Sequence, residues 1–375
     1  MITLYDLGDF CKMQNENKCF PSTILDACYH RKSDDLVSNV KTKMAAMMIE
    51  QDVWPLTINK KEYRNSVVCS PYTTYISYPL DELKKIKKNW VKLSVLLNTV
   101  LMGLICRITK LNKIVQINNN LNATLIHSPQ FYSLLPEITD KIVNHYPKHA
   151  VVFIRVNNML DIQLLETLKK NDYLVFHDRS SHVFFPENNF QNRTDTKKDF
   201  DLLKKSNYML VHHEELLISD AKRLSELYQM LFIGKHSKSN PLYTEDYFKL
   251  AIQHHWHHYT ALRNKEGRID AFSSWVEKGN NMSCGPMGYD TTVDIKVGLY
   301  RQAVALYLMH AHEKQLIFNM GGGSDKFKLN RGSTKTLEYT AVYYKHLPFY
   351  RHVPWKIFHW AFNKFFKKIM QNEVF

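Results

Sequence analysis

The sequence lacks the features that mark secreted and disulfide-built proteins. Its 375 residues include six cysteines, and no two of them form a Cys-x-x-Cys pair. A chain of this length with so few and such widely spaced cysteines does not resemble a disulfide-dense secreted domain. Residues 1–6 begin neither a basic nor an apolar signal region. We therefore expect free thiols, no signal peptide and a cytoplasmic location.

Long apolar stretches are also scarce. The longest candidate covers residues 93–106, between the charges of Lys92 and Arg107. A membrane-spanning helix needs about 20 apolar residues, so this stretch is short for one. The pattern favours a buried core helix, with a membrane segment as the alternative.

Positive charge is abundant. Lysine and arginine exceed the acidic residues by 14, and 45% of the residues are hydrophobic, as expected of a packed globular protein large enough for two cores. A basic excess favours an anionic partner, such as tRNA, coenzyme A, an acidic carrier protein or a lipid headgroup, and a solvated basic surface is equally compatible. Four lysines at residues 84–88 are interpreted as a solvated helix face, or as part of a basic groove.

Hydrophobic periodicity predicts alternating strands and helices in both halves of the chain. In the first half we expect strands at 113–117, 150–154 and 173–185, and helices at 136–146 and 160–170. After a polar linker, 186–198, we expect a strand at 208–211, helices from 219 and at 245–252, a hairpin of 259–262 and 268–276, a helix at 295–313, and strands at 315–318 and 337–344. This order predicts an α/β (α+β) fold in which helices flank mixed twisted sheets.

The segment from Phe318 to Gly332 is the most informative stretch for chemistry. Three consecutive glycines, Gly321 to Gly323, allow a backbone to approach a ligand closely. A helical turn after them would direct N–H groups at an anion, and Lys326, Lys328 and Arg331 add positive charge. The alternative is a flexible turn with a solvated basic face.

This segment resembles the signature of the FemAB/FemX-type peptidyltransferases and related acyltransferases. Their C-terminal domain, which is related to the GNAT fold, carries a Phe-Lys pair after a Gly-rich turn and then Arg or Phe and Gly. Here those positions are Phe327-Lys328 and Arg331-Gly332. The resemblance implies two GNAT-like domains, residues 1–190 and 200–375, that meet near 186–205 and share a cleft. It also implies transfer of an acyl or aminoacyl group to an amine.

The resemblance assigns roles to individual residues. Lys328 would bind the donor and stabilise the oxyanion that forms during acyl transfer. Chemical reasoning, apart from the resemblance, adds Glu338: the attacking amine must lose a proton, which Glu338 would accept, or it would orient the acceptor. An ordinary surface glutamate is the alternative. The remaining donor-binding residues would be Asn319, Gly321, Gly322, Gly323, Lys326, Phe327 and Arg331.

The donor stays open at this point. GNAT enzymes that use acetyl-coenzyme A carry a basic, glycine-containing turn before their third helix, and residues 285–294 contain Gly285 and Gly288 but no basic residue. An acyl-carrier protein or an aminoacyl-tRNA is therefore an alternative to coenzyme A, and no tightly bound cofactor is expected. A non-catalytic module that binds an anionic ligand or nucleic acid is the second interpretation.

Two further patterns carry open alternatives. The run of histidines at 254–258 is interpreted as lining a cleft or as structural, since no nearby Cys, Asp or Glu completes a familiar zinc spacing; no metal is expected.

An aromatic stripe from Trp355 to Ile369 predicts a terminal helix. That helix either docks on the core or forms a basic amphipathic contact, through residues 355–370, with a membrane or an acidic partner.

Overall fold

The computed structural model describes residues 2–17, 23–187, 190–234 and 237–366. Its strands are β1 (Ile2–Asp6), β2 (Lys43–Ile49), β3 (Asp52–Ile58), β4 (Ile114–Ile117), β5 (Ala150–Asn157), β6 (Leu174–Phe184), β7 (Met209–His212), β8 (His258–Arg263), β9 (Ile269–Lys278), β10 (Asn281–Cys284), β11 (Gly288–Tyr289), β12 (Ile317–Gly321) and β13 (Thr334–Tyr343). Its α-helices are α1 (Leu7–Asn17), α2 (Ile24–His30), α3 (Ser33–Leu36), α4 (Tyr78–Glu82), α5 (Asn89–Ile108), α6 (Gln130–Ser133), α7 (Leu135–His145), α8 (Ile162–Lys170), α9 (Thr194–Lys204), α10 (Ala221–Phe232), α11 (Glu245–Gln253), α12 (Leu299–Glu313), α13 (Asp325–Asn330) and α14 (Val353–Ala361).

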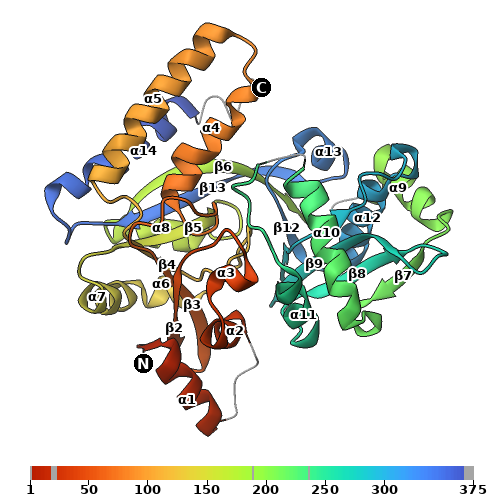
Figure 1. Ribbon diagram of the computed structural model, residues 1–375, viewed down its shortest axis with the longest axis horizontal. Coiled ribbons are helices and arrows are strands. Elements are labelled where there is room, and N and C mark those ends of the chain that lie inside the picture. The colour runs from red at the N-terminus through yellow and green to blue at the C-terminus, as the bar shows by residue number, and fades with distance from the viewer. Residues whose placement is uncertain (1, 18–22, 188–189, 235–236, 367–375) are drawn as a thin grey trace.

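The last strand of the chain lies in the middle of the sheet. The strand order is β1-β2-β3-β4-β5-β13-β6-β12-β10-β9-β8-β7, and β11 pairs with β9. The pairs β4–β5 and β10–β12 are parallel, and the other pairs are antiparallel. Figure 1 shows β13, in blue, among the yellow-green strands of the middle of the chain.

This arrangement confirms a mixed α/β fold with a large mixed sheet flanked by helices. It also corrects one expectation. The strands of both halves join in a single thirteen-stranded sheet, so the prediction of a separate sheet for each half is wrong. The cause is β13, which follows the second half in sequence but pairs with β5 and β6 of the first half. A division into domains at residues 190–200 stays a prediction.

Most elements with strong periodicity lie where the sequence predicts them. All eight residues of β5 are buried, as expected of a strand covered on both faces. The hairpin of β8 and β9 turns at Gly267, whose φ of 81° favours glycine. Two boundaries differ more widely than the rest. The helix α12 begins at Leu299, because Gly298 before it adopts a left-handed conformation, and the predicted linker contains the start of α9.

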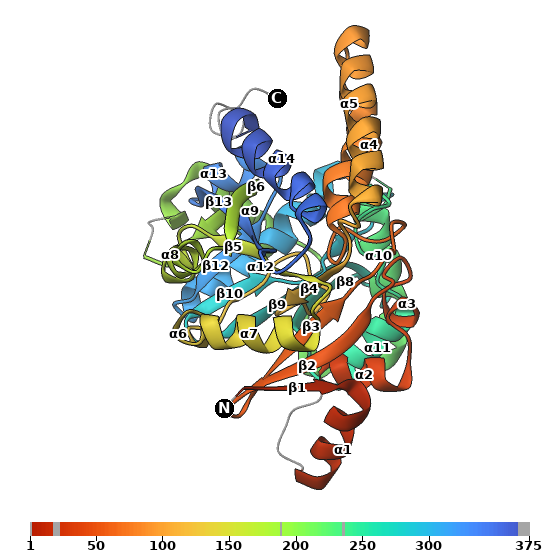
Figure 2. The same cartoon turned by 90° about the vertical axis from the view of Figure 1, so that its left-hand side faces the viewer.

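Helices cover both faces of the sheet and tie the two halves together. One apolar cluster combines Phe10 and Leu25 of the N-terminal helices with Leu224 and Phe248 of α10 and α11. A second cluster packs α7 and α8 against strands of the first half, and a third packs α12 under β9, β10 and β12. The halves therefore share buried apolar surface. Figures 1 and 2 show the sheet that joins them and the helices on its faces.

Helix α5 is exposed, which corrects the prediction of a buried core helix. Only 11% of its most apolar window is buried, and by its length of 20 residues and its hydropathy of 1.7 it meets the criteria for a helix that could cross a membrane. The hairpin of α4 and α5 projects from the body of the molecule (Figure 2). The apolar composition of α5 predicts that its side chains are shielded from water, but the described residues of this chain do not shield them.

The C-terminal helix docks on the core through the first part of its aromatic stripe. Trp355 and Phe358 of α14 are buried and pack in a cluster with Tyr75 and Phe176. Phe362 packs against the same cluster from the π-helical turn that follows α14, whereas Trp360 on the other side is 55% exposed. Residues 367–370 of the predicted helix lie outside the described residues.

We expect Trp355→Ala to destabilise the protein by about 3–5 kcal/mol, because it removes a fully buried aromatic side chain and leaves a cavity. The matched control is Trp360→Ala, which removes an exposed tryptophan from the same helix and should change stability by less than about 0.5 kcal/mol. Urea unfolding followed by circular dichroism measures both. Equal unfolding midpoints for the two variants would contradict the docking of α14.

Candidate functional site between the two halves

The triple-glycine turn has the backbone that only glycine readily adopts. It follows β12 and leads into α13. Gly321 and Gly323 have φ values of 68° and 78°, in the left-handed region. Gly322 lies so close to β6 that a Cβ there would come within 2.9 Å of the Ser180 carbonyl oxygen. The three glycines therefore serve a tight turn against β6.

Lys328 closes this turn from inside the protein. Its side chain is buried, and its Nζ donates hydrogen bonds to the carbonyl oxygens of Met320, Gly321 and Gly322, each at 2.9 Å. Burial lowers the pKa of Lys328 to about 8. All three protons of the ammonium are thereby used. The ammonium therefore points into the turn, where carbonyl oxygens converge rather than the expected N–H groups.

Glu338 is a buried ion-pair partner and not a surface residue. The Nε of Arg179 donates to its Oε2 at 2.5 Å, and the Nδ2 of Asn319 donates to its Oε1 at 3.3 Å. Burial favours a higher pKa for Glu338, but the guanidinium groups of Arg179 and Arg155 outweigh this and hold the pKa below its usual value. A carboxylate that is paired and hard to protonate is a weak proton acceptor.

The other predicted cations are not gathered at one anion site. The Arg331 guanidinium donates to Asp199 on α9 and to the carbonyl oxygen of Phe327, over whose ring it lies at 3.4 Å. Phe327 in turn packs against Tyr300 of α12. These contacts hold α13 to its neighbours. Of the three predicted cations, only Lys326 has an exposed side chain.

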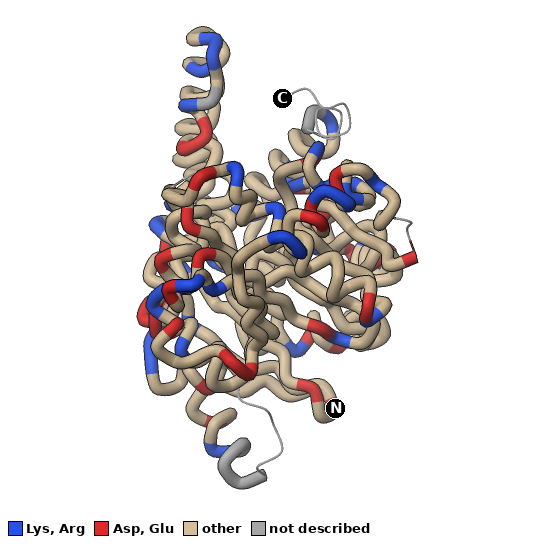
Figure 3. Tube along the Cα trace, turned by 90° about the vertical axis from the view of Figure 1, so that its right-hand side faces the viewer, with Lys and Arg blue, Asp and Glu red and all other residues tan. Residues whose placement is uncertain are grey.

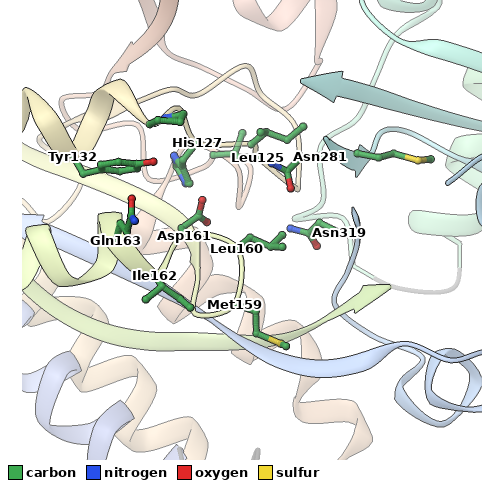
Figure 4. A pocket seen from close by; sticks show the side chains of 13 residues that line it. Leu125, His127, Tyr132, Met159, Leu160, Asp161, Ile162, Gln163, Asn281 and Asn319 are labelled. Atoms are coloured by element: carbon green, nitrogen blue, oxygen red, sulfur yellow. The ribbon is translucent and has the colours of Figure 1, made fainter. Parts of the chain in front are cut away.

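A pocket of about 340 Å³ lies where the two halves meet. It opens beside the parallel strands β10 and β12, whose pairing extends to Ser283 and Asn319. Asn281, Met282 and Asn319 line it from the second half, and the first half contributes Leu125, Ile126, His127, Pro129, Tyr132, Met159, Leu160, Asp161, Ile162 and Gln163 (Figure 4). Asn319 is the one predicted site residue among them.

Asp161 is the carboxyl group of this pocket. Burial raises its pKa, against the opposing effect of nearby His127. Its Oδ2 accepts a hydrogen bond from the backbone N–H of Asn157 at 2.8 Å. Sequence reasoning missed both Asp161 and His127. Asp161 falls in the first turn of the helix predicted at 160–170, where an acidic residue is ordinary. Asp161 makes no side-chain cap hydrogen bond, and only the fold shows its position in the pocket.

A loop of the first half fills the space where β10 and β12 separate. The Thr124 hydroxyl donates to the Cys284 carbonyl oxygen at 2.5 Å, and a Cβ on Gly321 would come within 3.1 Å of the Thr124 methyl group. A second pocket of about 240 Å³ lies beside this contact, and Ile126 lines both pockets. The opening between the strand ends is therefore occupied by the protein itself.

The histidine run does not assemble into a metal site. Helix α11 ends at Gln253 and β8 begins at His258, so His254 and His258 do not share a helix face. His257 is buried, with its Nε2 at 2.8 Å from the Tyr247 hydroxyl. Within the described ranges, no group of three or more His, Cys, Asp or Glu residues is placed to hold a metal ion.

The chain was compared with known proteins at the level of sequence and structure. No protein-family model matches it, and no curated protein does. Among solved structures, FemX aligns with a TM-score of 0.49 and 8% identity over 86% of this chain and 91% of FemX. L-PGS from Bacillus licheniformis aligns at 0.47 and 13% over 67% and 82%, and a GCN5-related N-acetyltransferase from Kribbella flavida at 0.33 and 8% over 62% and 80%. At these scores the similarities alone assign neither a family nor a function.

We expect Lys328→Met to destabilise the protein by about 2–4 kcal/mol, because it removes the donor shared by three carbonyl groups, and each buried polar group left without a partner costs about 1–3 kcal/mol. The control is Lys326→Met, two residues away and exposed, which should change stability by less than about 0.5 kcal/mol. Urea unfolding measures both. An unaltered midpoint in Lys328→Met would mean that the ammonium does not hold the turn.

A second expectation concerns pH. Burial lowers the pKa of His257 to about 3 from 6.5. Below pH 6.5 the unfolded chain therefore binds a proton that the folded protein excludes, and the free energy of unfolding falls by about 1.4 kcal/mol per pH unit until about pH 3. His257→Gln should remove this part of the pH dependence, and His258→Gln, at an exposed position, should keep it. Urea titrations at several pH values test this, and the same slope in both variants would refute it.

Proposed function

We propose that the protein transfers an acyl or aminoacyl group from an activated donor to an amine, in the pocket between its two halves. The observation that carries this proposal is the Asp161 carboxyl, whose pKa is raised by burial, in a pocket lined by both halves. A carboxyl group with a raised pKa is a better proton acceptor than an ordinary one. The motif that resembles the FemAB/FemX type agrees with this reaction class.

Each group has a role in the proposed reaction. The amine attacks the donor carbonyl carbon, a C–N bond forms, and the C–O or C–S bond to the carrier breaks. Asp161 accepts the proton that the amine loses and supplies it to the leaving group. The amides of Asn281 and Gln163 are available to donate hydrogen bonds to the oxyanion. Lys328 and Glu338 act from behind the pocket wall, where they position Asn319 and the glycine turn.

The structure supports some donors better than others. The segment before α12 lacks a basic turn, Gly288 packs against the backbone of Leu227, and Asp290 pairs with Arg223 at 2.6 Å. The backbone at 288–290 packs against α10, so its N–H groups do not form an open turn that could bind the phosphates of coenzyme A. The net charge of +14 suits a polyanionic carrier. We therefore favour an aminoacyl-tRNA or an acidic acyl-carrier protein, and with them a cytoplasmic location.

A non-catalytic binding module is the second candidate. Two observations favour it: the Lys328 side chain is buried inside the protein, and Thr124 fills the opening between β10 and β12.

Native mass spectrometry of protein purified from its own host distinguishes the two candidates. A bound donor that disappears when an amine is added supports transfer, and a bound ligand that no amine discharges supports the binding module.

We expect Asp161→Asn to lower kcat/KM for transfer by about 10²–10⁴, because it removes the proton acceptor and keeps the shape of the side chain. Asp140→Asn, an exposed aspartate on α7, is the matched control and should keep full activity. The assay follows transfer of a labelled group from aminoacyl-tRNA, acyl-carrier protein or acyl-coenzyme A to a panel of amines. Wild-type rates in Asp161→Asn would exclude this carboxyl group from the mechanism.

A further inference from the structure

Helix α5 carries an apolar stripe along its exposed side. The stripe consists of large side chains three or four residues apart, which places them on one face of a helix. At 20 residues and about 1.5 Å per residue, α5 is about 30 Å long. The exposed members of the stripe are Trp90, Leu93, Leu96, Leu97, Val100, Leu101, Leu104 and Ile108.

The last turns of α5 are held by the protein on the side away from the stripe, which fixes the rotation of the helix and turns the stripe outward. Cys106 is fully buried, and a Cβ on Gly103 would come within 3.1 Å of the side chains of Ile76 and Tyr72. The Nε of Arg107 donates to the Tyr72 hydroxyl at 3.0 Å. Rotation of α5 to bury its stripe would break these contacts. An exposed apolar surface of this extent marks an interaction site.

Positive charge borders the stripe at both ends. Lys84, Lys87, Lys88 and Lys92 are exposed at the far end of the hairpin, which Figure 3 shows in blue. Arg107 and Lys110 are exposed at the end near the body. The sequence has no acidic residue between Glu82 and Glu137. The surface around the stripe therefore attracts anions and repels other basic surfaces.

We propose that this stripe docks on an anionic lipid bilayer, with α5 lying in the plane of the headgroups. The stripe enters the boundary of the acyl chains, Trp90 lies at the depth that tryptophan prefers, and the lysines reach lipid phosphates. A bilayer supplies an apolar layer beneath an anionic one and needs no shape match. A spanning orientation is disfavoured, because Lys92 and Asn98 lie off the stripe and the last turns of α5 are tied to the protein through Arg107.

The proposal stands apart from the proposed transfer reaction and concerns where the protein acts. Helix α14 contacts α5 and lies at the same end of the molecule (Figure 2). It carries Trp360, which is 55% exposed. The C-terminal segment at 355–370 is therefore a candidate for a second contact with the same bilayer. The two contacts are separable, because each has one exposed tryptophan, Trp90 or Trp360.

The test is flotation of the purified full-length chain with vesicles of phosphatidylcholine alone or mixed with phosphatidylglycerol. We expect binding to the mixed vesicles, weakened by salt, and at least about tenfold less binding by the double variant Leu97→Glu, Leu101→Glu. The matched control is Leu217→Glu, Ile218→Glu. These two side chains are 58% and 51% exposed, against 61% and 59% for Leu97 and Leu101, so the control adds the same charge at similar exposure and should bind like wild type.

A second measurement locates the contact. Lipids brominated in their acyl chains should quench tryptophan fluorescence in wild type and in Trp360→Phe, and much less in Trp90→Phe. Quenching that depends on Trp360 alone would overturn the proposal in favour of the C-terminal helix.

Three further outcomes would also overturn it. The first is absence of binding to the mixed vesicles, and the second is equal binding by the Leu97→Glu, Leu101→Glu variant with an unchanged melting temperature. The third is a dimer in sedimentation velocity that this variant converts to a monomer, since a second copy would then cover the stripe.

Discussion

The ion pair between Glu338 of β13 and Arg179 of β6 constrains the whole molecule. The Glu338 carboxylate is fully buried, whereas the Arg179 side chain is 24% exposed. Loss of the arginine would leave a buried charge without its partner, at a cost of about 3–5 kcal/mol. Any shift in register of β13 would separate them. Because β13 also pairs with β5, this contact fixes how the two halves meet. The same carboxylate holds Asn319, which lines the pocket. The pocket wall therefore depends on a long-range strand pairing.

Local patterns predicted the parts of the fold that local forces determine. The apolar run of β5, the amphipathic stripe of α10 and the turn at Gly267 are each encoded within about ten residues. The spacing of Lys328 from the glycines also predicted correctly that they lie together. It did not predict the direction of the ammonium, which the packing of α13 against β6 and β13 decides. The three N-terminal strands were not predicted from the sequence.

The sequence could not predict features that depend on residues distant in the chain or on molecules outside it. Asp161 falls in the first turn of a predicted helix, and it becomes a pocket carboxyl because β10 and β12 of the second half come to lie opposite. Hydropathy identified α5 as a helix that needs covering but not what covers it. The central position of β13 follows no local signal, because its partners β5 and β6 precede it by more than a hundred residues.

That central position has a consequence for biosynthesis. Strands β5 and β6 leave the ribosome long before Thr334–Tyr343 is translated, and at ordinary rates of translation the delay is on the order of ten seconds. During this time both strands have an unpaired edge at the place that β13 later fills, and such edges recruit other chains. The finished protein has no opening there. This risk of aggregation therefore falls on the nascent chain alone, and a chaperone that shields these edges would raise the yield of folded protein.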